Sequence, residues 1–516
     1  MRILYYNWVD YLDAERRAGG VTVYQRNLMD SHAARDDVEA WFLASGVSYD
    51  MMPNRTPRWE RIRHGPSEGR ARRFEIVNSG TLAPSHFSFG NPAQVEHPAT
   101  AECFCDFVAA KGPFDIIHFN NFEGIPIQVL DQLKERFPDM GIVFSLHNYY
   151  PICPQVNLWY REKALCTDFK EGRACRHCLL HKPQERHVRQ ANATAYLLKR
   201  KGLEAGTFLF DRGFQPTVRF LSRSVRALNR LRRQPDPMAL PAPHEDVWSY
   251  AQGELHRVDP PGRNFAERRT VMIDTINRTC DLVLGVSEQV SKIARDYGIR
   301  PEIVQTSYIG TRHAHRFATT APRADVPRAG GELTLGYLGY MRADKGFFFL
   351  LDALEELPLE LARRLHLVVA APRGPEDAMN QLHGLSDYLA SVHYADGYTH
   401  DTLDPILSSV DVGLVPVLWE DNLPQVAIEM HARHIPLLTS DRGGPSELGR
   451  HPEMVFTAGD TDSFADRIRY LLEGHLDVEA YWAGAMAPQS VPDHVDELVA
   501  HYTAVRESIL AVPSPS

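Results

Sequence analysis

Short apolar runs alternate with amphipathic stretches along most of the chain. The runs are rich in β-branched and aromatic residues, as expected of strands that are buried on both faces. They read "RILYYN", "FDIIHFN", "GIVFSLH" and "CDLVLGVSE" in the first half, and "LTLGYLG", "LHLVVAA", "VDVGLVPV" and "IPLLTS" in the second. Helical patterns such as "VTVYQRNLM" lie between them, so the alternation predicts an α/β protein with parallel sheets.

One segment interrupts this alternation and predicts a division into two domains. Residues 316–331, which include "ATTAPRADVPRAGG", are rich in Pro, Ala and Gly and are interpreted as a linker. The linker separates a predicted N-terminal domain, 1–315, from a predicted C-terminal domain, 332–486, each with a Rossmann-like series of strands and helices. A length of 516 residues also favours more than one domain.

Three further segments depart from the regular alternation. The ranges of about 45–105 and 183–270 fit it poorly and are interpreted as insertions in the first domain. Within the second range, residues 217–233 place apolar residues on one helical face and arginines largely off it. Such a helix could rest on an anionic membrane surface or, as the alternative, pack on its own domain. Residues 487–516 have apolar positions at helical spacing, which predicts a C-terminal helix that packs back on the N-terminal domain.

The composition narrows the classes of partner and location. A formal net charge of −10 disfavours nucleic acid as a partner, because binding phosphates requires a basic face. No segment approaches the roughly 18 uninterrupted apolar residues of a membrane span, and the initial "MRILYYNW" lacks the apolar core of a signal peptide. We therefore expect a cytoplasmic protein, at most peripheral to the inner face of the membrane, with reduced cysteines.

The stretch "LWEDNLPQVAIEM", residues 418–430, combines polar residues with a helix that opens on proline. Pro424 suits the first turn of a helix, and the amides that follow it, with the helix dipole behind them, can bind an anion. Glu429 comes eight residues after Asp421, so the two carboxylates could bracket a sugar at one end and a ribose at the other. The alternative is an ordinary capped helix with a solvated glutamate.

Several motifs in order along the chain resemble one enzyme family. "DNLPQVAIE" resembles the E-x7-E motif of the retaining glycosyltransferases of family 4, which have the GT-B fold of two facing Rossmann-like domains. "GYLGYMRADKGFFFLLDAL" is similar to the strand, phosphate-binding loop and helix that begin the second domain of that family. Further similar segments are "AGGVTVYQRNL", "LVLGVSEQV" and "IPLLTSDRGGPSELG". The resemblance implies a GT-B enzyme that uses a nucleotide-sugar donor and needs no catalytic metal.

The resemblance also implies roles for individual residues. Arg342 and Lys345 would supply the cations that stabilise a departing diphosphate, and Glu429 would accept the ribose hydroxyls. Asp421 would contact a hydroxyl of the donor sugar, and His147, at the end of a parallel strand, would lie near the same sugar. The other predicted donor-binding residues are Gly19 and Gly20 in a turn that approaches the phosphates, Tyr398 against the base, and Asn422, Leu423, Pro424, Gln425 and Val426 at the start of the helix.

Two positions depart from the family pattern. Tyr340 stands where the family usually carries an arginine, five residues before Lys345, and Arg342 could replace it. The first carboxylate of the motif is Asp421 instead of glutamate, with Glu420 beside it. The shorter side chain could change the donor preference, or Glu420 could do part of the work.

Four cysteines cluster between the predicted strands of the first domain. Cys153, Cys166, Cys175 and Cys178 follow the spacing C-x12-C-x8-C-x2-C, which predicts a closed, structural zinc site that would pin a long loop. His177 or His181 could replace one of the sulfurs, and a redox pair is the alternative.

These features together predict a retaining glycosyltransferase that moves a sugar from a nucleotide-diphosphate donor to an acceptor hydroxyl. UDP is the favoured nucleotide and GDP the next. The acceptor could be a glycan, a lipid-linked sugar or a small molecule. Two alternatives remain open, namely a GT-B nucleotide-sugar epimerase or hydrolase, and a scaffold that binds a nucleotide-sugar without turnover.

Overall fold

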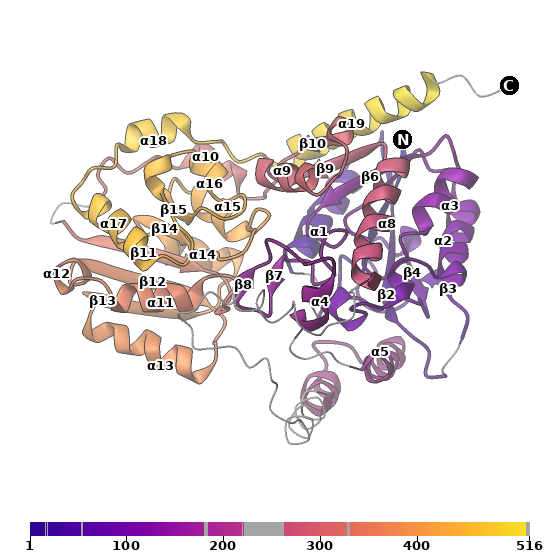
Figure 1. Ribbon diagram of the computed structural model, residues 1–516, viewed down its shortest axis with the longest axis horizontal. Helices are drawn as coiled ribbons and strands as arrows, with labels where there is room; N and C mark the ends of the chain where they lie inside the picture. The colour runs from indigo at the N-terminus through magenta and orange to yellow at the C-terminus, as the bar shows by residue number, and fades with distance from the viewer. Residues whose placement is uncertain are drawn as a thin grey trace.

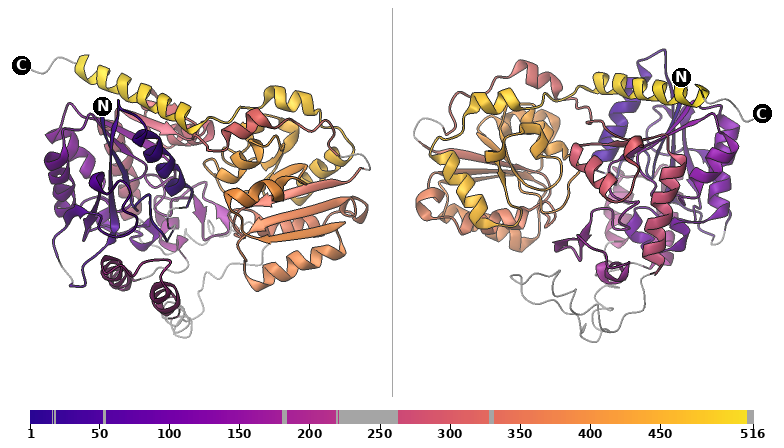
Figure 2. Two further views of the ribbon diagram at one scale, coloured as in Figure 1. Left: turned by 180° about the vertical axis from the view of Figure 1, so that it is seen from behind. Right: turned by 45° about the horizontal axis from the view of Figure 1, so that its top comes forward.

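The protein consists of two α/β lobes that lie side by side (Figure 1). The computed structural model describes residues 1–15, 17, 19–52, 55–179, 184–218, 220, 263–327 and 331–511. Each lobe is built on one large sheet with helices on its faces, as Figure 2 shows from two further sides. The predicted α/β class with two Rossmann-like halves is therefore confirmed.

The N-terminal sheet has eight strands in the order β10-β9-β6-β5-β1-β2-β4-β3. All neighbouring pairs are parallel except β3 and β4. The strands are β1 (Arg2–Asn7), β2 (Glu39–Ser48), β3 (Arg58–Arg61), β4 (Arg73–Val77), β5 (Ile116–Phe119), β6 (Gly141–Leu146), β9 (Leu282–Gly285) and β10 (Val304–Thr306). A small antiparallel ribbon, β7 (Trp159–Tyr160) with β8 (Ala164–Leu165), stands apart from the sheet.

Helices cover the N-terminal sheet and follow its strands. They are α1 (Gly20–Ala33), α2 (Pro98–Lys111), α3 (Val129–Arg136), α4 (Arg173–Cys178), α5 (Glu185–Arg200), α8 (Arg263–Thr279) and α9 (Glu288–Asp296). Helix α10 (Ala314–Thr319) lies instead on the C-terminal lobe, where Phe317 stacks on His434. Because parallel strands need a crossover connection, a helix between successive strands is the expected arrangement.

The two ranges that were predicted to be insertions have different structures. The range 45–105 supplies β4, which pairs in parallel with β2, and β3, which pairs with β4 at the edge. That part therefore belongs to the sheet. The range 183–270 contributes α5 and α8, and most of the basic stretch 217–233 lies outside the described residues.

The C-terminal sheet has six parallel strands in the order β13-β12-β11-β14-β15-β16. The strands are β11 (Leu333–Leu338), β12 (Leu365–Ala371), β13 (Ser391–Asp396), β14 (Val412–Val415), β15 (Leu437–Ser440) and β16 (Val455–Phe456). The helices are α11 (Phe347–Glu355), α12 (Leu359–Ala362), α13 (Glu376–Gly384), α14 (His400–Leu407), α15 (Gln425–His431), α16 (Ser446–Gly449), α17 (Thr461–Leu472) and α18 (Val478–Gly484).

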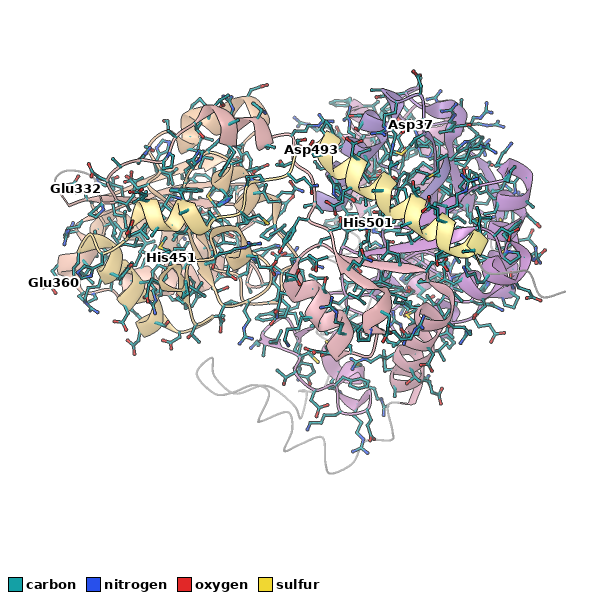
Figure 3. All side chains as sticks on the ribbon, turned by 90° about the horizontal axis from the view of Figure 1, so that it is seen from above. Asp37, Glu332, Glu360, His451, Asp493 and His501 are labelled. Atoms are coloured by element: carbon teal, nitrogen blue, oxygen red, sulfur yellow. The ribbon has the colours of Figure 1, made fainter. Side chains whose placement is uncertain are left out.

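The last helix, α19 (Val491–Ala511), returns to the N-terminal domain and packs on α1 and β6. Figure 3 shows it crossing that domain from Asp493 past His501. Its Tyr502 hydroxyl is 3.0 Å from the Tyr5 hydroxyl and 2.5 Å from His118 Nδ1. These buried hydrogen bonds fix the position of the helix, in addition to the burial of its apolar side chains.

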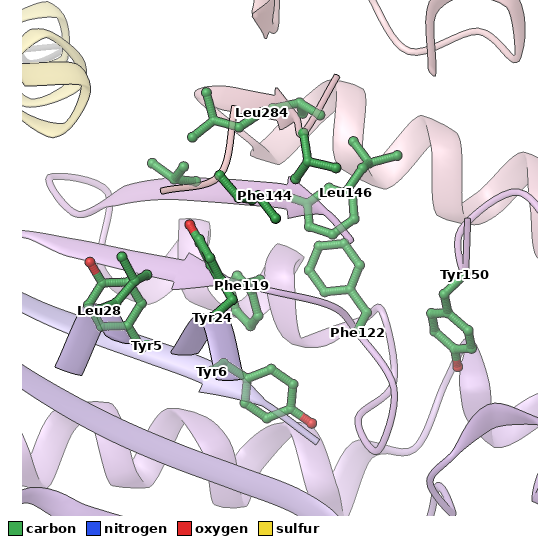
Figure 4. Packing of buried hydrophobic residues seen from close by; sticks show 14 of the residues in the cluster. Tyr5, Tyr6, Tyr24, Leu28, Phe119, Phe122, Phe144, Leu146, Tyr150 and Leu284 are labelled. Atoms are coloured by element: carbon green, nitrogen blue, oxygen red, sulfur yellow. The ribbon is translucent and has the colours of Figure 1, made fainter. Parts of the chain in front are cut away.

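The central strands are buried on both faces, as their near-continuous apolar sequences predict. Figure 4 shows aromatic and aliphatic side chains of β1, β5, β6 and the loops beyond them packed together, among them Tyr6, Phe119, Phe122 and Phe144. None of the described helices has the length and apolar character that a membrane span requires.

Candidate functional site

The motif helix α15 begins at Gln425, one residue later than the sequence suggested. Pro424 is the residue before the helix, because its ψ of 134° is extended while its carbonyl already accepts the N–H of Ala427 at 3.0 Å. The prediction that Pro424 occupies the first turn is therefore corrected by one position. No side chain caps the amides at this helix start.

Lys345 reaches the first carboxylate of the motif. Its Nζ donates to Asp421 Oδ2 at 2.5 Å and lies 5.1 Å from the centre of the Trp419 ring. Asp421 is only 5% exposed, whereas the Lys345 side chain is 26% exposed. The pair thus joins the loop before α11 to the loop before α15 at a place that solvent can reach.

Arg342 lies on the same loop but does not reach the motif. Its guanidinium binds Asp344 through two hydrogen bonds of 2.9 and 2.8 Å, and 59% of its side chain is exposed. Tyr340 is also exposed, and its backbone carbonyl accepts the hydroxyl of Tyr337 at 2.7 Å. The structure therefore places Lys345 in contact with Asp421, whereas Arg342 is exposed and paired with Asp344.

The two adjacent carboxylates of the motif point in different directions. Glu420 accepts the backbone N–H of Gly443 at 3.0 Å and the amide of Gln289 at 3.1 Å. Asp421 faces Lys345 instead. Glu420 therefore holds neighbouring loops together. Of the two carboxylates, Asp421 is the one that contacts Lys345.

Glu429 is a buried carboxylate on the inner face of α15. It is 6% exposed, and its Oε2 accepts the hydroxyl of Tyr398 at 2.8 Å. Its Oε1 lies 3.8 Å from His313 Nε2. Burial raises the pKa of Glu429, while Tyr398 and the nearby Arg433 oppose the shift. Two residues predicted to meet the nucleoside, Glu429 and Tyr398, are thus in direct contact.

The first domain meets the motif at the end of β6. Asn422 Nδ2 donates to the carbonyl of Leu146 at 3.1 Å, and Asn422 Oδ1 is buried without a hydrogen-bond partner. His147 follows directly and its Nε2 lies 3.2 Å from Asn120 Oδ1. Burial lowers the pKa of His147 to about 3, so its imidazole is neutral.

The glycine turn of the first domain also lies against the motif. Gly19 has a φ of 55° and a ψ of −129°, a conformation that favours glycine, and a Cβ there would meet nothing within 4 Å. A Cβ on Gly20 would lie 3.7 Å from Gln425 Cγ, so the start of α1 adjoins the start of α15. Leu423 is buried in the apolar core, and Val426 is partly buried against it.

The cysteine cluster does not have the arrangement of a metal site. The four cysteines line one small cavity together with Trp159 and Arg269. Burial raises the pKa of Cys175 to about 12 and also raises that of Cys178, whose Sγ donates to Gln155 Oε1 at 2.7 Å. Within the described ranges, no group of three or more His, Cys, Asp or Glu side chains could hold a metal ion. The prediction of structural zinc at Cys153, Cys166, Cys175 and Cys178 is therefore not supported.

Sequence reasoning missed Glu447, which fastens the two domains together. Its carboxylate accepts the backbone N–H of Glu288 at 2.9 Å and of Gln289 at 2.8 Å, and the hydroxyl of Tyr308 at 2.8 Å. These amides open α9, where the helix dipole favours a negative charge. Helices α9 and α16 adjoin where the lobes meet (Figure 1).

The glycine pair before α16 lets two backbone segments approach each other closely, which the sequence alone indicates only weakly. A Cβ on Gly443, whose φ is 67°, would lie 2.0 Å from the carbonyl oxygen of Asp421. A Cβ on Gly444 would lie 2.3 Å from the carbonyl oxygen of Asn422. Two adjacent glycines after a buried strand were the available sign that another backbone passes here.

Comparison with known proteins finds a family that resembles the C-terminal domain. Residues 332–474 match the family Glycosyl transferases group 1. This match covers most of the C-terminal domain, so that part of the chain is similar to glycosyltransferases of this family. A comparison with curated protein sequences finds no match.

Solved structures resemble the whole chain. An α,α-trehalose-phosphate synthase (UDP-forming) from Burkholderia vietnamiensis has a TM-score of 0.54 at 14% identity, covering 99% of this chain and 98% of that one. The enzyme of the same name from Burkholderia xenovorans, in complex with glucose-6-phosphate, has 0.51 at 12%, covering 98% and 100%. Sucrose-phosphate synthase from Thermosynechococcus elongatus has 0.50 at 16%, covering 99% and 97%. These similarities confirm the GT-B fold.

Proposed function

We propose that the protein is a retaining, metal-independent glycosyltransferase of the family 4 type. It would transfer a sugar from a UDP-sugar, or next from a GDP-sugar, to an acceptor hydroxyl of a glycan, a lipid-linked sugar or a natural product. The observation that carries the proposal is the Lys345–Asp421 pair beside the buried Glu429, facing the Gly19–Gly20 turn of the other domain.

Lys345 is the cation for the departing diphosphate in this proposal. In the structure its ammonium group is held by Asp421. A diphosphate that enters between α1 and α15 would take over the ammonium group, and Asp421 would then accept a hydroxyl of the donor sugar. A fixed cation at this place stabilises the charge that develops as the diphosphate leaves. Arg342 would contribute after exchanging Asp344 for a phosphate.

Glu429 is the proposed acceptor for the two ribose hydroxyls. A carboxylate with two oxygens on one side matches a vicinal diol, and hydrogen bonds to a charged group are about twice as strong as neutral ones. Tyr398 now donates to Glu429 and would exchange this bond for contact with the base. Burial raises the pKa of Glu429, so the diol would also compensate a carboxylate that lacks water.

The chemical step needs no protein nucleophile. The bond between the anomeric carbon and the diphosphate oxygen breaks, and the acceptor oxygen bonds to that carbon on the same face. The acceptor proton passes to the departing diphosphate oxygen, which balances the charge. His147 is neutral, so its role is to hydrogen-bond a sugar hydroxyl beside the anomeric centre. Domain closure would exclude the water that would otherwise hydrolyse the donor.

We further propose that residues 1–315 carry the acceptor side and residues 332–486 the nucleotide side, in the cytoplasm. Contact of the basic stretch 217–233 with a membrane surface stays a prediction. The test is incubation with a panel of UDP- and GDP-sugars and acceptors, with and without magnesium, followed by NMR of the product. The expected result is metal-independent transfer with the donor's anomeric configuration. Release of nucleotide without any acceptor would favour the epimerase or hydrolase, and binding without turnover would favour the scaffold.

A further inference from the structure

Two segments connect the domains, one after β10 and one before α19, and they lie side by side. Thr311 N–H donates to the carbonyl of Gln489 at 2.9 Å, and Thr311 forms a parallel bridge with Ser490. A Cβ on Gly310 would lie 2.8 Å from the Ser490 carbonyl oxygen and 2.8 Å from His494 Cβ. Residues in such connections absorb the movement of two domains relative to each other, so His494 lies directly at the hinge.

His494 joins this hinge to the first helix of the chain. It lies in the first turn of α19, next to Asp493 in Figure 3, and is only 1% exposed. Its Nε2 lies 2.9 Å from the hydroxyl of Tyr24 on α1, which is also buried. Its Nδ1 is buried and has no hydrogen-bond partner in the described part of the chain. The bond to Tyr24 is therefore the hydrogen bond that orients this buried imidazole.

Helix α1 in turn holds His147 from two sides. The Tyr24 ring lies against the His147 ring, with centroids 4.5 Å apart and 52° between the planes. On the other side, His147 Nε2 lies 3.2 Å from Asn120 Oδ1. Asn120 Nδ2 donates to the carbonyl of Tyr6 at 3.4 Å and to the side-chain oxygen of Gln25 on α1. The oxygen of this amide is thus the acceptor, and His147 carries its proton on Nε2. This leaves Nδ1 of the partly exposed ring to accept a sugar hydroxyl.

We propose that His494 and Tyr24 are positioning residues for sugar transfer, because they couple the hinge to the orientation of the His147 imidazole. The proposal rests on the proposed glycosyltransferase function, in which His147 lies beside the donor sugar. When the domains close on a donor, the hinge moves with His494, and the bond to Tyr24 passes this movement to α1 and to His147. The Gly19–Gly20 turn that begins α1 adjoins the motif helix. One helix therefore sets the contacts with both the phosphates and the sugar.

The protein contains a matched pair of buried side chains that serves as a control. The Tyr5 hydroxyl lies 2.7 Å from His32 Nε2, and the two ring centroids are 5.5 Å apart, against 5.6 Å for Tyr24 and His494. His32 is 2% exposed, and its Nδ1 is likewise buried without a hydrogen-bond partner among the described residues. Loss of either imidazole removes an equivalent buried hydrogen bond, but the tyrosine bonded to His494 is the one that lies against His147.

The first measurement observes the His147 ring without any substrate. Nitrogen-15 NMR of the full chain, labelled at histidine, detects the ring nitrogens, and the signals that are lost in His147→Gln assign them. In the wild type the two shifts should be widely separated, as expected of a neutral ring protonated on Nε2. In His494→Phe this separation should narrow, because a loosened ring samples both tautomers. His32→Phe should leave the separation unchanged.

The second measurement separates turnover from binding. Release of UDP from UDP-glucose in the presence of the acceptor panel should slow about 10–100-fold in His494→Phe, since a misplacement of about 1 Å can cost about 10²-fold in rate. The Kd of UDP should change less than about threefold, because His494 touches no nucleotide in this account. His494→Gln carries a polar atom near the position of Nε2 and should regain most of the turnover.

A milder variant isolates the hydrogen bond. Tyr24→Phe keeps the ring against His147 and removes only the hydroxyl that His494 binds. Its turnover should also fall, and combining it with His494→Phe should cause no further loss, because both substitutions break the same bond. This variant decides the proposal if His494→Phe does not fold.

Each result supports or overturns the proposal. Effects on the His147 signals and on turnover that occur in His494→Phe and not in His32→Phe would support it. Equal effects of these two variants would overturn it, since both would then act only through stability. Unmoved His147 signals in both His494→Phe and Tyr24→Phe would also overturn it. A wild type that neither binds UDP nor releases it from UDP-glucose would refute the proposed function instead, and the ring-nitrogen comparison would still decide the positioning.

Discussion

Lys345→Met removes the cation of the central ion pair and keeps most of the aliphatic side chain. The pair is short, at 2.5 Å, and Asp421 is nearly inaccessible to water while Lys345 is not. Exposed pairs contribute up to about 1 kcal/mol, and loss of one partner of a buried pair costs about 3–5 kcal/mol. We therefore expect an intermediate loss of about 2 kcal/mol in the free energy of unfolding. For a domain of this size that corresponds to a decrease of roughly 4–8 °C in Tm.

The same substitution should have a larger effect on catalysis than on folding. Removing one fixed charge that stabilises a developing anion lowers kcat by about 10²–10³-fold. The double variant Lys345→Met with Asp421→Asn separates the two effects, because it also removes the unpaired buried carboxylate. Its Tm should lie closer to that of the wild type than the Tm of Lys345→Met does, while its turnover should be no faster.

The assays are calorimetric unfolding for Tm and a coupled assay of UDP release for kcat. The reasoning would be refuted if Lys345→Met kept its turnover within about threefold of the wild type. It would also be refuted if the double variant regained turnover, since the lysine would then only have neutralised Asp421.

Three other perturbations test separate parts of the account. Glu429→Gln should weaken UDP binding about 10–100-fold, which is the equivalent of losing hydrogen bonds to a charged group. Its Tm should stay equal or rise slightly, because the variant removes a carboxylate whose pKa is raised by burial. An unchanged Kd in calorimetry would count against the contact of Glu429 with the ribose. Glu447→Gln should lower kcat about tenfold, because it loosens the contact between the domains. It should change the Kd of UDP less than threefold, because Glu447 touches no nucleotide in this account. An equal kcat and an equal radius of gyration by X-ray scattering would contradict this. Burial lowers the pKa of His32, His431 and His494 to about 4 each, so between pH 6.5 and 4 the unfolded chain binds protons that the native protein does not. Stability should therefore fall as the pH falls, by up to about 1.4 kcal/mol per pH unit for each histidine, and a Tm that is flat from pH 7 to 5 would rule this out.

The sequence was sufficient for the class of fold, and some of the residues it predicted for the site lie together in the structure, such as Lys345 with Asp421. Buried parallel strands have a recognisable composition, and the ends of such strands are where ligands bind, which is how His147 could be chosen. Likewise, the spacing of Asp421 and Glu429 on a short helix limits where the two carboxylates can lie. The order of the strands could not be predicted, because β4 joins the sheet from a stretch with few strand signals.

Side-chain direction and contacts between domains could not be predicted from the sequence. Glu420 and Asp421 are neighbours in the chain, and only the tertiary contacts with Gln289 and Lys345 decide which of them faces the cation. The bond from Glu447 to α9 joins residues 159 positions apart, and nothing local indicates it. The cysteine spacing was compatible with zinc, but spacing does not determine whether four sulfurs converge on one point.

The most direct test of the central claim is a thermal-shift measurement with UDP, GDP, ADP and TDP, each with and without magnesium. A nucleotide at about 100 times its Kd should stabilise the fold by about 2.7 kcal/mol. The account predicts that UDP, or else GDP, raises Tm selectively and without magnesium, and that Lys345→Met and Glu429→Gln reduce the shift. No shift with any diphosphate, or an equal shift in both variants, would contradict a nucleotide-sugar site at this motif.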